Sequence, residues 1–265
     1  MNELELIDTL EAHLQTILQQ QGLQRIWGEK PNTYIVHGLN LQKCFHEVIQ
    51  RVWYQKLGGE MNLYVLEGQL VFQLEDASYT LAHVFLYRPH VANMPTGVQR
   101  HRKGEPPLRD WSLLDRRYST YLDSVFEKLY TFWNHQATLC NYYLPKSLKT
   151  QAVDFSRVID QIPAEFHHLE AYKWLRSFKE KEYKAFNEFR RHVVHHGPFG
   201  ARHSLKFMER YTPEQERQQR LDYLNAPFQL RNMILLARES YYHMLCLLVA
   251  MDDLYFPISV SGKGG

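Results

Sequence analysis

Helical periodicity in the second half of the chain is the feature that most restricts the fold. Between Ser112 and Tyr143, apolar and aromatic side chains recur three or four residues apart and form one stripe. A second such segment runs from His168 to His196, where Gly197-Pro198 predicts a stop. Pro227 to Leu254 is the most apolar segment and is typical of a central bundle helix. We therefore expect a mainly α-helical fold.

Shorter patterns predict further helices. One runs from Glu3 to Gln20, with Gly22 as its stop, and another from Asn40 to Lys56. A short helix is expected from Asp154 to Gln161. Thr212, followed by Pro213, is typical of the capped start of a helix that precedes the last one.

The first half of the chain is predicted to contain a small β-hairpin. Within LYVLEGQLVFQLED (63–76), Glu67-Gly68 lies between two β-rich runs. Periodicity leaves the next segment, 78–88, open between strand and helix. Pro89 to Pro107 holds four prolines and two glycines and predicts a loop. We expect an N-terminal α(+β) region over 1–110, a helical bundle over 111–256 and a flexible tail over 257–265.

Composition narrows the class of protein. With 45% hydrophobic and 14% aromatic residues the chain can bury a core, which excludes a disordered protein. The longest apolar run, Met244 to Met251, is far shorter than the ~20 residues that span a bilayer. The acidic, amphipathic start differs from a signal peptide, so we expect a cytoplasmic protein without a membrane partner. The three distant cysteines, Cys44, Cys140 and Cys246, indicate neither a disulfide framework nor a thiolate zinc site.

A formal net charge of +2 hides two basic segments. Arg88 to Arg117 holds seven basic and three acidic residues, and Lys184 to Arg210 holds six and two, with four histidines. Such charge suits a polyanion such as RNA, although solvated loops balanced by acidic faces elsewhere would give the same pattern. The candidate contacts with the RNA backbone are Arg100, Arg102, Lys103, Arg116, Arg117 and Arg202.

The densest polar cluster is RRHVVHHG at 190–197, at the end of the second long helix. An arginine fork can hold a scissile phosphate and stabilise charge that gathers on it. A histidine of near-neutral pKa can take the proton of a ribose 2′-hydroxyl or give one to the leaving oxygen. Because this nucleophile is part of the substrate, the reaction needs no metal or other cofactor.

The cluster resembles the R-x(4–6)-H motif of the HEPN superfamily, which comprises all-α ribonucleases and nucleotide-binding domains. Arg191 and His196 enclose four residues, and His192 occupies the polar position after the arginine. The resemblance covers roughly Ser112 to Leu254. It implies a metal-independent endoribonuclease, active as a homodimer, that leaves a 2′,3′-cyclic phosphate and a 5′-hydroxyl.

The resemblance also implies roles for the motif residues. Arg191 would contact the scissile phosphate, His196 would transfer a proton and His192 would orient the site. Arg190 and His195 are alternates in the same cluster. The family further implies a toxin or antiphage defence effector, with an antitoxin or another defence protein as partner.

Helix geometry and a second spacing match leave alternatives open. On a regular helix, Arg191 and His196 differ by about 140° in direction, but Arg191 and His195 by only about 40°. The predicted pair therefore needs a wide cleft, a distorted last turn or two subunits. Arg238 and His243 have the same spacing within an apolar helix, where a core or near-core role for His243 is the better interpretation.

Three other functions fit the same features. The chain could be a non-catalytic HEPN-like module that binds a nucleotide, RNA or a protein through the basic helix end. A metal could bind His192, His195 and His196, although the adjacent arginines would repel it. The third alternative is a helical scaffold that oligomerises through 227–254.

Overall fold

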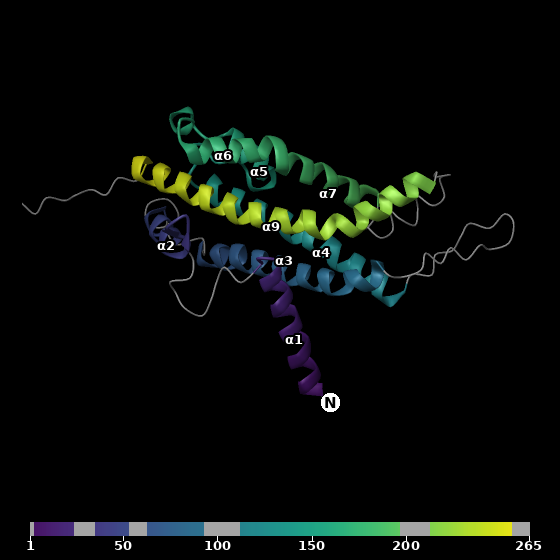
Figure 1. The fold of residues 1–265 in the computed structure, drawn as a ribbon. Helices are drawn as coiled ribbons and strands as arrows, with labels where there is room; N and C mark the ends of the chain where they lie inside the picture. Colours follow the sequence, from purple (N-terminus) through teal and green to yellow (C-terminus); the bar gives the residue numbers. More distant parts are fainter. Residues whose placement is uncertain (1–2, 24–34, 53–62, 93–111, 197–212, 256–265) are drawn as a thin grey trace, which may run out of the picture. The chain divides into compact units, whose positions relative to one another are not determined.

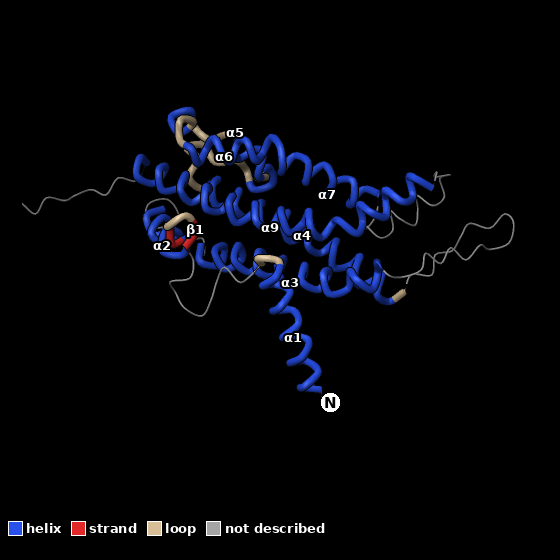
Figure 2. Tube along the Cα trace, viewed as in Figure 1, coloured by secondary structure: helices blue, strands red, loops and turns tan. Residues whose placement is uncertain are grey.

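The computed structural model describes residues 3–23, 35–52, 63–92, 112–196 and 213–255 (Figure 1). The described part is mainly α-helical, as predicted (Figure 2). Its longer helices are α1 (Glu3–Gln20), α2 (Leu41–Val52), α3 (Leu63–Ala92), α4 (Leu113–Asn141), α5 (Phe155–Asp160), α6 (Glu170–Phe178), α7 (Lys184–His196) and α9 (Pro213–Tyr255). Short 3₁₀ turns, η2 (Thr150–Ala152) and η3 (Ala164–Phe166), flank α5, and a π-helical turn, η4 (Lys179–Tyr183), joins α6 to α7.

Local capping explains why several helices begin and end where the sequence predicts. The Ser112 hydroxyl accepts from the Asp115 backbone N–H (3.1 Å) at the start of α4, and the Asp154 carboxylate accepts from the Arg157 N–H (3.0 Å) at the start of α5. Gly22, at φ +65°, ends α1. There Leu23 N–H donates to the Leu18 carbonyl at 2.8 Å, as in a Schellman motif.

The hairpin predicted within 63–76 is wrong, because α3 runs through the whole segment. Its buried apolar residues recur at helical rather than alternating spacing, and Gly68 lies exposed in open space. The same helix settles 78–88 as helical and includes Pro89, so the predicted loop begins later; residues 93–107 lie outside the described part. The buried members of the stripe are Leu66, Leu70, Leu74, Ala77, Leu81 and Val84.

A two-stranded hairpin lies instead just before α2 (Figure 2). Strands β1 (Ile35–Val36) and β2 (Leu39–Asn40) pair antiparallel. His37 (φ 49°) and Gly38 (φ 82°) form the connection. Positive φ at both positions is characteristic of a type I′ turn. The Asn40 side chain then accepts from the Lys43 N–H at 3.0 Å and caps α2, whose predicted end at Lys56 lies beyond the described residues.

The two helices predicted near the C-terminus are a single helix, because α9 continues through Pro227. Proline lacks the N–H that would bond to the Tyr223 carbonyl one turn earlier. The buried Tyr118 hydroxyl donates to that carbonyl at 3.0 Å. Arg88 Nε donates to the next carbonyl, of Leu224, at 2.7 Å. Donors from α4 and α3 thus satisfy the carbonyls beside the proline.

Backbone contacts divide the chain into two compact units, each built from three stretches. Unit 1 comprises 1–24, 74–129 and 185–235, and unit 2 comprises 25–73, 130–184 and 236–265. Both combine residues from before and after position 110, so the predicted division there does not follow the units. The expected tail, 257–265, lies outside the described residues.

Each unit has an aromatic core. In unit 1 the Tyr118 ring meets that of Tyr223 edge-on at 4.9 Å. In unit 2 the fully buried Trp133 ring lies 5.5 Å from that of Tyr183. Trp133 Nε1 donates to the buried Ser240 hydroxyl at 3.1 Å, so the polar atom of the largest core side chain is satisfied.

Within the described residues, one helical segment is long and apolar enough to cross a membrane. It spans Leu221–Tyr255, and its most apolar window has a mean hydropathy of 1.3. Core helices of soluble proteins also meet this criterion, and Leu230, Ile234, Met244 and Leu248 of this segment are buried. The cytoplasmic location stays a prediction.

Candidate functional site

The Arg–His cluster occupies the last two turns of α7, and aromatic packing in unit 1 sets the rotation of this helix. The ring of the buried Phe186 stacks on that of Phe126 in α4, with centroids 5.6 Å apart. Phe189 stacks on the same ring at 4.9 Å. The side of α7 that carries these two residues therefore packs against α4.

Helix phase places the members of the cluster relative to that packed side. At about 100° per residue, position 193 falls on the side of Phe186 and Phe189. Positions 191 and 195 fall on the opposite side, about 40° apart, while position 196 lies about 140° from 191. Because α7 is α-helical as far as His196, its backbone places Arg191 and His195 on one side and His196 on another.

Arg190 is the one member of this cluster whose side chain is described, and it is half-buried. The side chains at 191–196 lie outside the described part, and the roles given to Arg191, His192, His195 and His196 stay predictions. Glu188, one turn earlier, is exposed.

Two of the predicted RNA contacts lie near the start of α4. Arg116 and Arg117 are both exposed. Arg117 Nη1 lies 3.4 Å from the Tyr87 hydroxyl, whose ring stacks on that of Tyr121 with centroids 5.9 Å apart. The His83 ring stacks on Tyr121 as well, at 4.8 Å. A guanidinium group beside stacked aromatic rings suits single-stranded nucleic acid, and the same rings pack α3 on α4. The other predicted contacts, Arg100, Arg102, Lys103 and Arg202, lie outside the described residues.

Unit 2 contains a second polar cluster that sequence reasoning missed. His37, at the tip of the hairpin, donates from Nε2 to the Glu239 carboxylate of α9 at 2.8 Å. Its ring also meets the Tyr242 ring edge-on at 4.9 Å. The His37 side chain is 57% exposed, so this contact contributes little stability. The His37-Gly38 pair directly after the β-branched Ile35 and Val36 was the available sequence signal.

Arg238 and His243, the second pair with the spacing of the motif, lie at the edge of the unit 2 core. The half-buried His243 stacks on Trp174 of α6, with centroids 4.5 Å apart. Burial lowers the pKa of His243, an effect that Glu239 opposes and His37 reinforces. Burial also lowers the pKa of Arg238. The structure thus places His243 near the core, as interpreted from its apolar helix.

The cysteines offer little nucleophilic chemistry. All three are free thiols. Burial raises the pKa of Cys44 and of Cys140 to about 12 and also raises that of Cys246. Since the thiolate is the reactive form, these side chains are poor nucleophiles near neutral pH.

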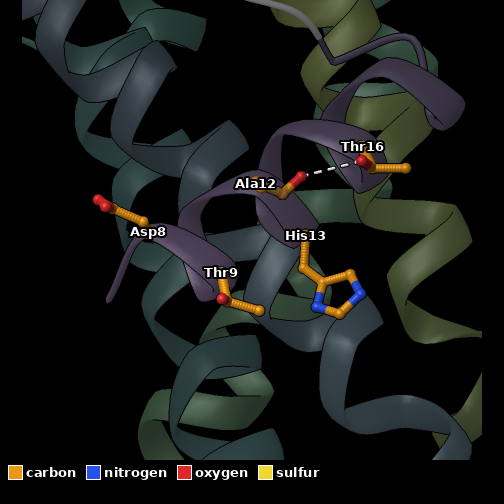
Figure 3. A pocket seen from close by; sticks show the side chains of 5 residues that line it. All are labelled: Asp8, Thr9, Ala12, His13 and Thr16. Carbon is orange, nitrogen blue, oxygen red and sulfur yellow. Dashed lines mark hydrogen bonds between the residues drawn. The ribbon is translucent and has the colours of Figure 1, made fainter. Parts of the chain in front are cut away.

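A shallow hollow lies beside α1. Figure 3 shows its lining, which consists of residues on one side of that helix. The Thr16 hydroxyl there donates to the Ala12 carbonyl at 2.9 Å. Among the side chains that the structure describes, no three His, Cys, Asp or Glu residues are arranged to hold a metal ion. The hollow is lined by Asp8, Thr9, Ala12, His13 and Thr16.

No protein-family model, curated protein or solved structure matches this chain. The HEPN resemblance therefore rests on the motif at 190–197 and stays a prediction.

Proposed function

We propose that this chain is a metal-independent endoribonuclease of the HEPN type. The supporting observation is the orientation of α7. Phe186 and Phe189 hold one side of the helix against Phe126, and the opposite side carries positions 191 and 195. An arginine and a histidine on a side turned away from the packing can meet a substrate together.

The chemistry follows from these groups. Arg191 holds the scissile phosphate, and an imidazole takes the proton from the ribose 2′-hydroxyl. The 2′-oxygen forms a bond to phosphorus while the bond to the 5′-oxygen breaks, and a second imidazole gives that oxygen a proton. The products are a 2′,3′-cyclic phosphate and a 5′-hydroxyl.

Helix phase divides the roles of the two histidines. His195 works with Arg191 of its own protomer, because both lie on one side of α7. His196 lies about 140° from Arg191 and works with the arginine of a second protomer in a homodimer. His192 orients the site, and the half-buried Arg190 flanks it. The family resemblance suggests that such a dimer serves as a toxin or defence effector under the control of a partner protein.

RNA binding without cleavage is the second candidate function. It is favoured by the exposed Arg116 and Arg117. Arg117 lies beside Tyr87, whose ring stacks on Tyr121, which the His83 ring also stacks on. Phosphate contacts and ring surfaces together are sufficient for salt-sensitive binding of single strands.

The test is cleavage of end-labelled mixed RNAs by the purified full chain in EDTA. We expect cyclic-phosphate products, and losses of about 100-fold or more in Arg191→Ala, His195→Ala and His196→Ala. Matched controls are Arg217→Ala and His168→Ala, which remove an exposed arginine and an exposed histidine elsewhere. Mixing Arg191→Ala with His196→Ala protomers should restore part of the activity if the pair acts across a dimer.

The other outcomes separate the alternatives. Equal cleavage by wild type and all three α7 variants would refute the site. Activity that EDTA abolishes and zinc restores would indicate a metal at the histidines. If only His243→Ala lost cleavage activity, the reaction would be assigned to Arg238 and His243 instead. Salt-sensitive binding without products would select the non-catalytic function.

A further inference from the structure

The apolar stripe of α1 extends beyond the part of the helix that is packed. In the C-terminal half, Leu14 is 0% and Leu18 4% exposed. The same stripe continues toward the N-terminus through Leu4, Ile7 and Leu10, which are 71%, 54% and 42% exposed. In Figure 1 this end of α1 points away from the other helices of its unit.

Contacts within unit 1 hold the packed half of α1. The Gln21 carbonyl accepts from Arg231 Nε of α9 at 2.6 Å, and Glu11 accepts from the Tyr79 hydroxyl of α3 at 3.2 Å. In proteins most of the stability of a helix comes from tertiary packing of its apolar face. Anchoring its C-terminal half therefore presents the exposed half as a preformed helix. A partner that binds it has little ordering entropy to overcome.

The charge of α1 indicates what kind of partner fits. Between Glu3 and Gln20 the carboxylates are Glu3, Glu5, Asp8 and Glu11, and lysine and arginine are absent. The side of the helix opposite the stripe is polar, with Thr9 and His13 among its residues (Figure 3). The exposed leucines and isoleucine thus lie in an acidic setting that suits a basic partner and would repel RNA or an anionic membrane.

A second copy of the chain fits this helix poorly. Since the exposed part of the stripe spans positions 4–10, pairing two copies there would place Glu3 of each copy, which lies on the same side of the helix, at the interface. Like charges at such an interface oppose association.

We propose that the N-terminal half of α1 is a docking helix for a partner protein with an apolar groove rimmed by lysine and arginine. Leu4, Ile7 and Leu10 fill the groove, as anchors of an amphipathic helix do. Glu3 and Asp8 meet the basic rim. The interaction is independent of the proposed cleavage, since it uses no residue of the α7 cluster.

The test measures binding of the full chain to a fluorescein-labelled helical peptide of about 18 residues, with leucine on one face and lysine elsewhere. A peptide with glutamate in place of lysine is the counter-probe. We expect micromolar binding of the lysine peptide and none of the glutamate peptide. Replacing Leu4, Ile7 and Leu10 together by glutamine, a good helix former, should weaken binding by about tenfold or more.

Two further variants separate apolar from charge contributions. Leu113→Gln removes an exposed leucine of α4 (63% exposed) and should leave binding unchanged. Glu3→Gln with Asp8→Asn should weaken binding at low salt and reduce its salt dependence. Far-UV circular dichroism checks that each variant retains its helices.

Several results would overturn the proposal. Equal binding of both peptides would show that charge does not select the partner. Binding that survives the triple glutamine substitution would place the contact elsewhere. Self-association of the wild type that this substitution abolishes would identify a second copy as the occupant.

Discussion

Replacing Tyr118 by phenylalanine should test how α9 tolerates a proline in its interior. The substitution removes one hydroxyl and keeps the ring against Tyr223. Tyr118 is 0% exposed, and its hydroxyl donates to the Tyr223 carbonyl at 3.0 Å. Pro227 has no N–H for that carbonyl, so the change leaves a buried acceptor without this donor.

The expected cost follows from the burial of this carbonyl. A buried group that loses its hydrogen-bond partner destabilises a protein by about 1–3 kcal/mol, so we expect about 2 kcal/mol for Tyr118→Phe. Pro227→Ala restores a backbone N–H one turn after Tyr223. In the Pro227→Ala protein, Tyr118→Phe should cost less than about 1 kcal/mol. The difference between the two costs is the coupling energy that a double-mutant cycle measures.

Urea unfolding followed by far-UV circular dichroism gives the four free energies of this cycle. Tyr121→Phe is the matched control, because it removes a hydroxyl from a half-buried ring one turn further along α4 and should change stability by less than about 0.5 kcal/mol. If Tyr118→Phe costs the same free energy of unfolding with and without Pro227, the Tyr118 hydroxyl does not compensate for the missing N–H of the proline.

Three further predictions concern stability and reactivity. Burial lowers the pKa of His243, so near that pKa the unfolded chain binds more protons than the folded protein. The stability that this histidine contributes is therefore complete above pH ~6.5 and falls on acidification. The acid-induced fall in melting temperature should be smaller in His243→Gln. Burial raises the pKa of Cys44 to about 12, so alkylation of this thiol by iodoacetamide at pH 8 should be slow until urea unfolds the protein. The contribution of Cys44 to stability should decline as the pH rises above about 9, where the thiol of the unfolded chain ionises. Gly22→Ala, at φ +65°, should cost about 1–2 kcal/mol, whereas Gly68→Ala, in open space on α3, should stabilise by about 0.5–1 kcal/mol; equal signs in urea unfolding would contradict the backbone argument.

Sequence reasoning succeeded where the determining contacts are local. The ends of α1, α4 and α5 depend on Gly22, Ser112 and Asp154, whose partners lie within a few residues. The hairpin predicted at 63–76 is wrong because it follows from residue type, whereas the spacing of the apolar residues decides the structure. The spacing of Leu66, Leu70 and Leu74 already indicated a helix.

Sequence reasoning failed where the determining partner is distant in the chain. The sequence predicts a helix start at Pro227, whereas the donor that lets α9 continue through it, the Tyr118 hydroxyl, comes from α4. The His37–Glu239 pair joins residues 202 positions apart, so no spacing rule could propose it. The α7 cluster is the opposite case, because its residues are contiguous and the pattern alone brings them into one short stretch of helix.

The stripe of α1 marks the limit of periodicity as a guide to function. Helical spacing of apolar residues predicts a helix whether the stripe meets its own core or another protein, since both remove the same side chains from water. Leu14 and Leu4 are equivalent in the pattern, yet one is 0% and the other 71% exposed. Burial in the folded chain distinguishes them, and acidic neighbours then indicate the partner. If α1 binds no basic groove, replacing Leu4, Ile7 and Leu10 by glutamine should leave binding of the lysine peptide unchanged.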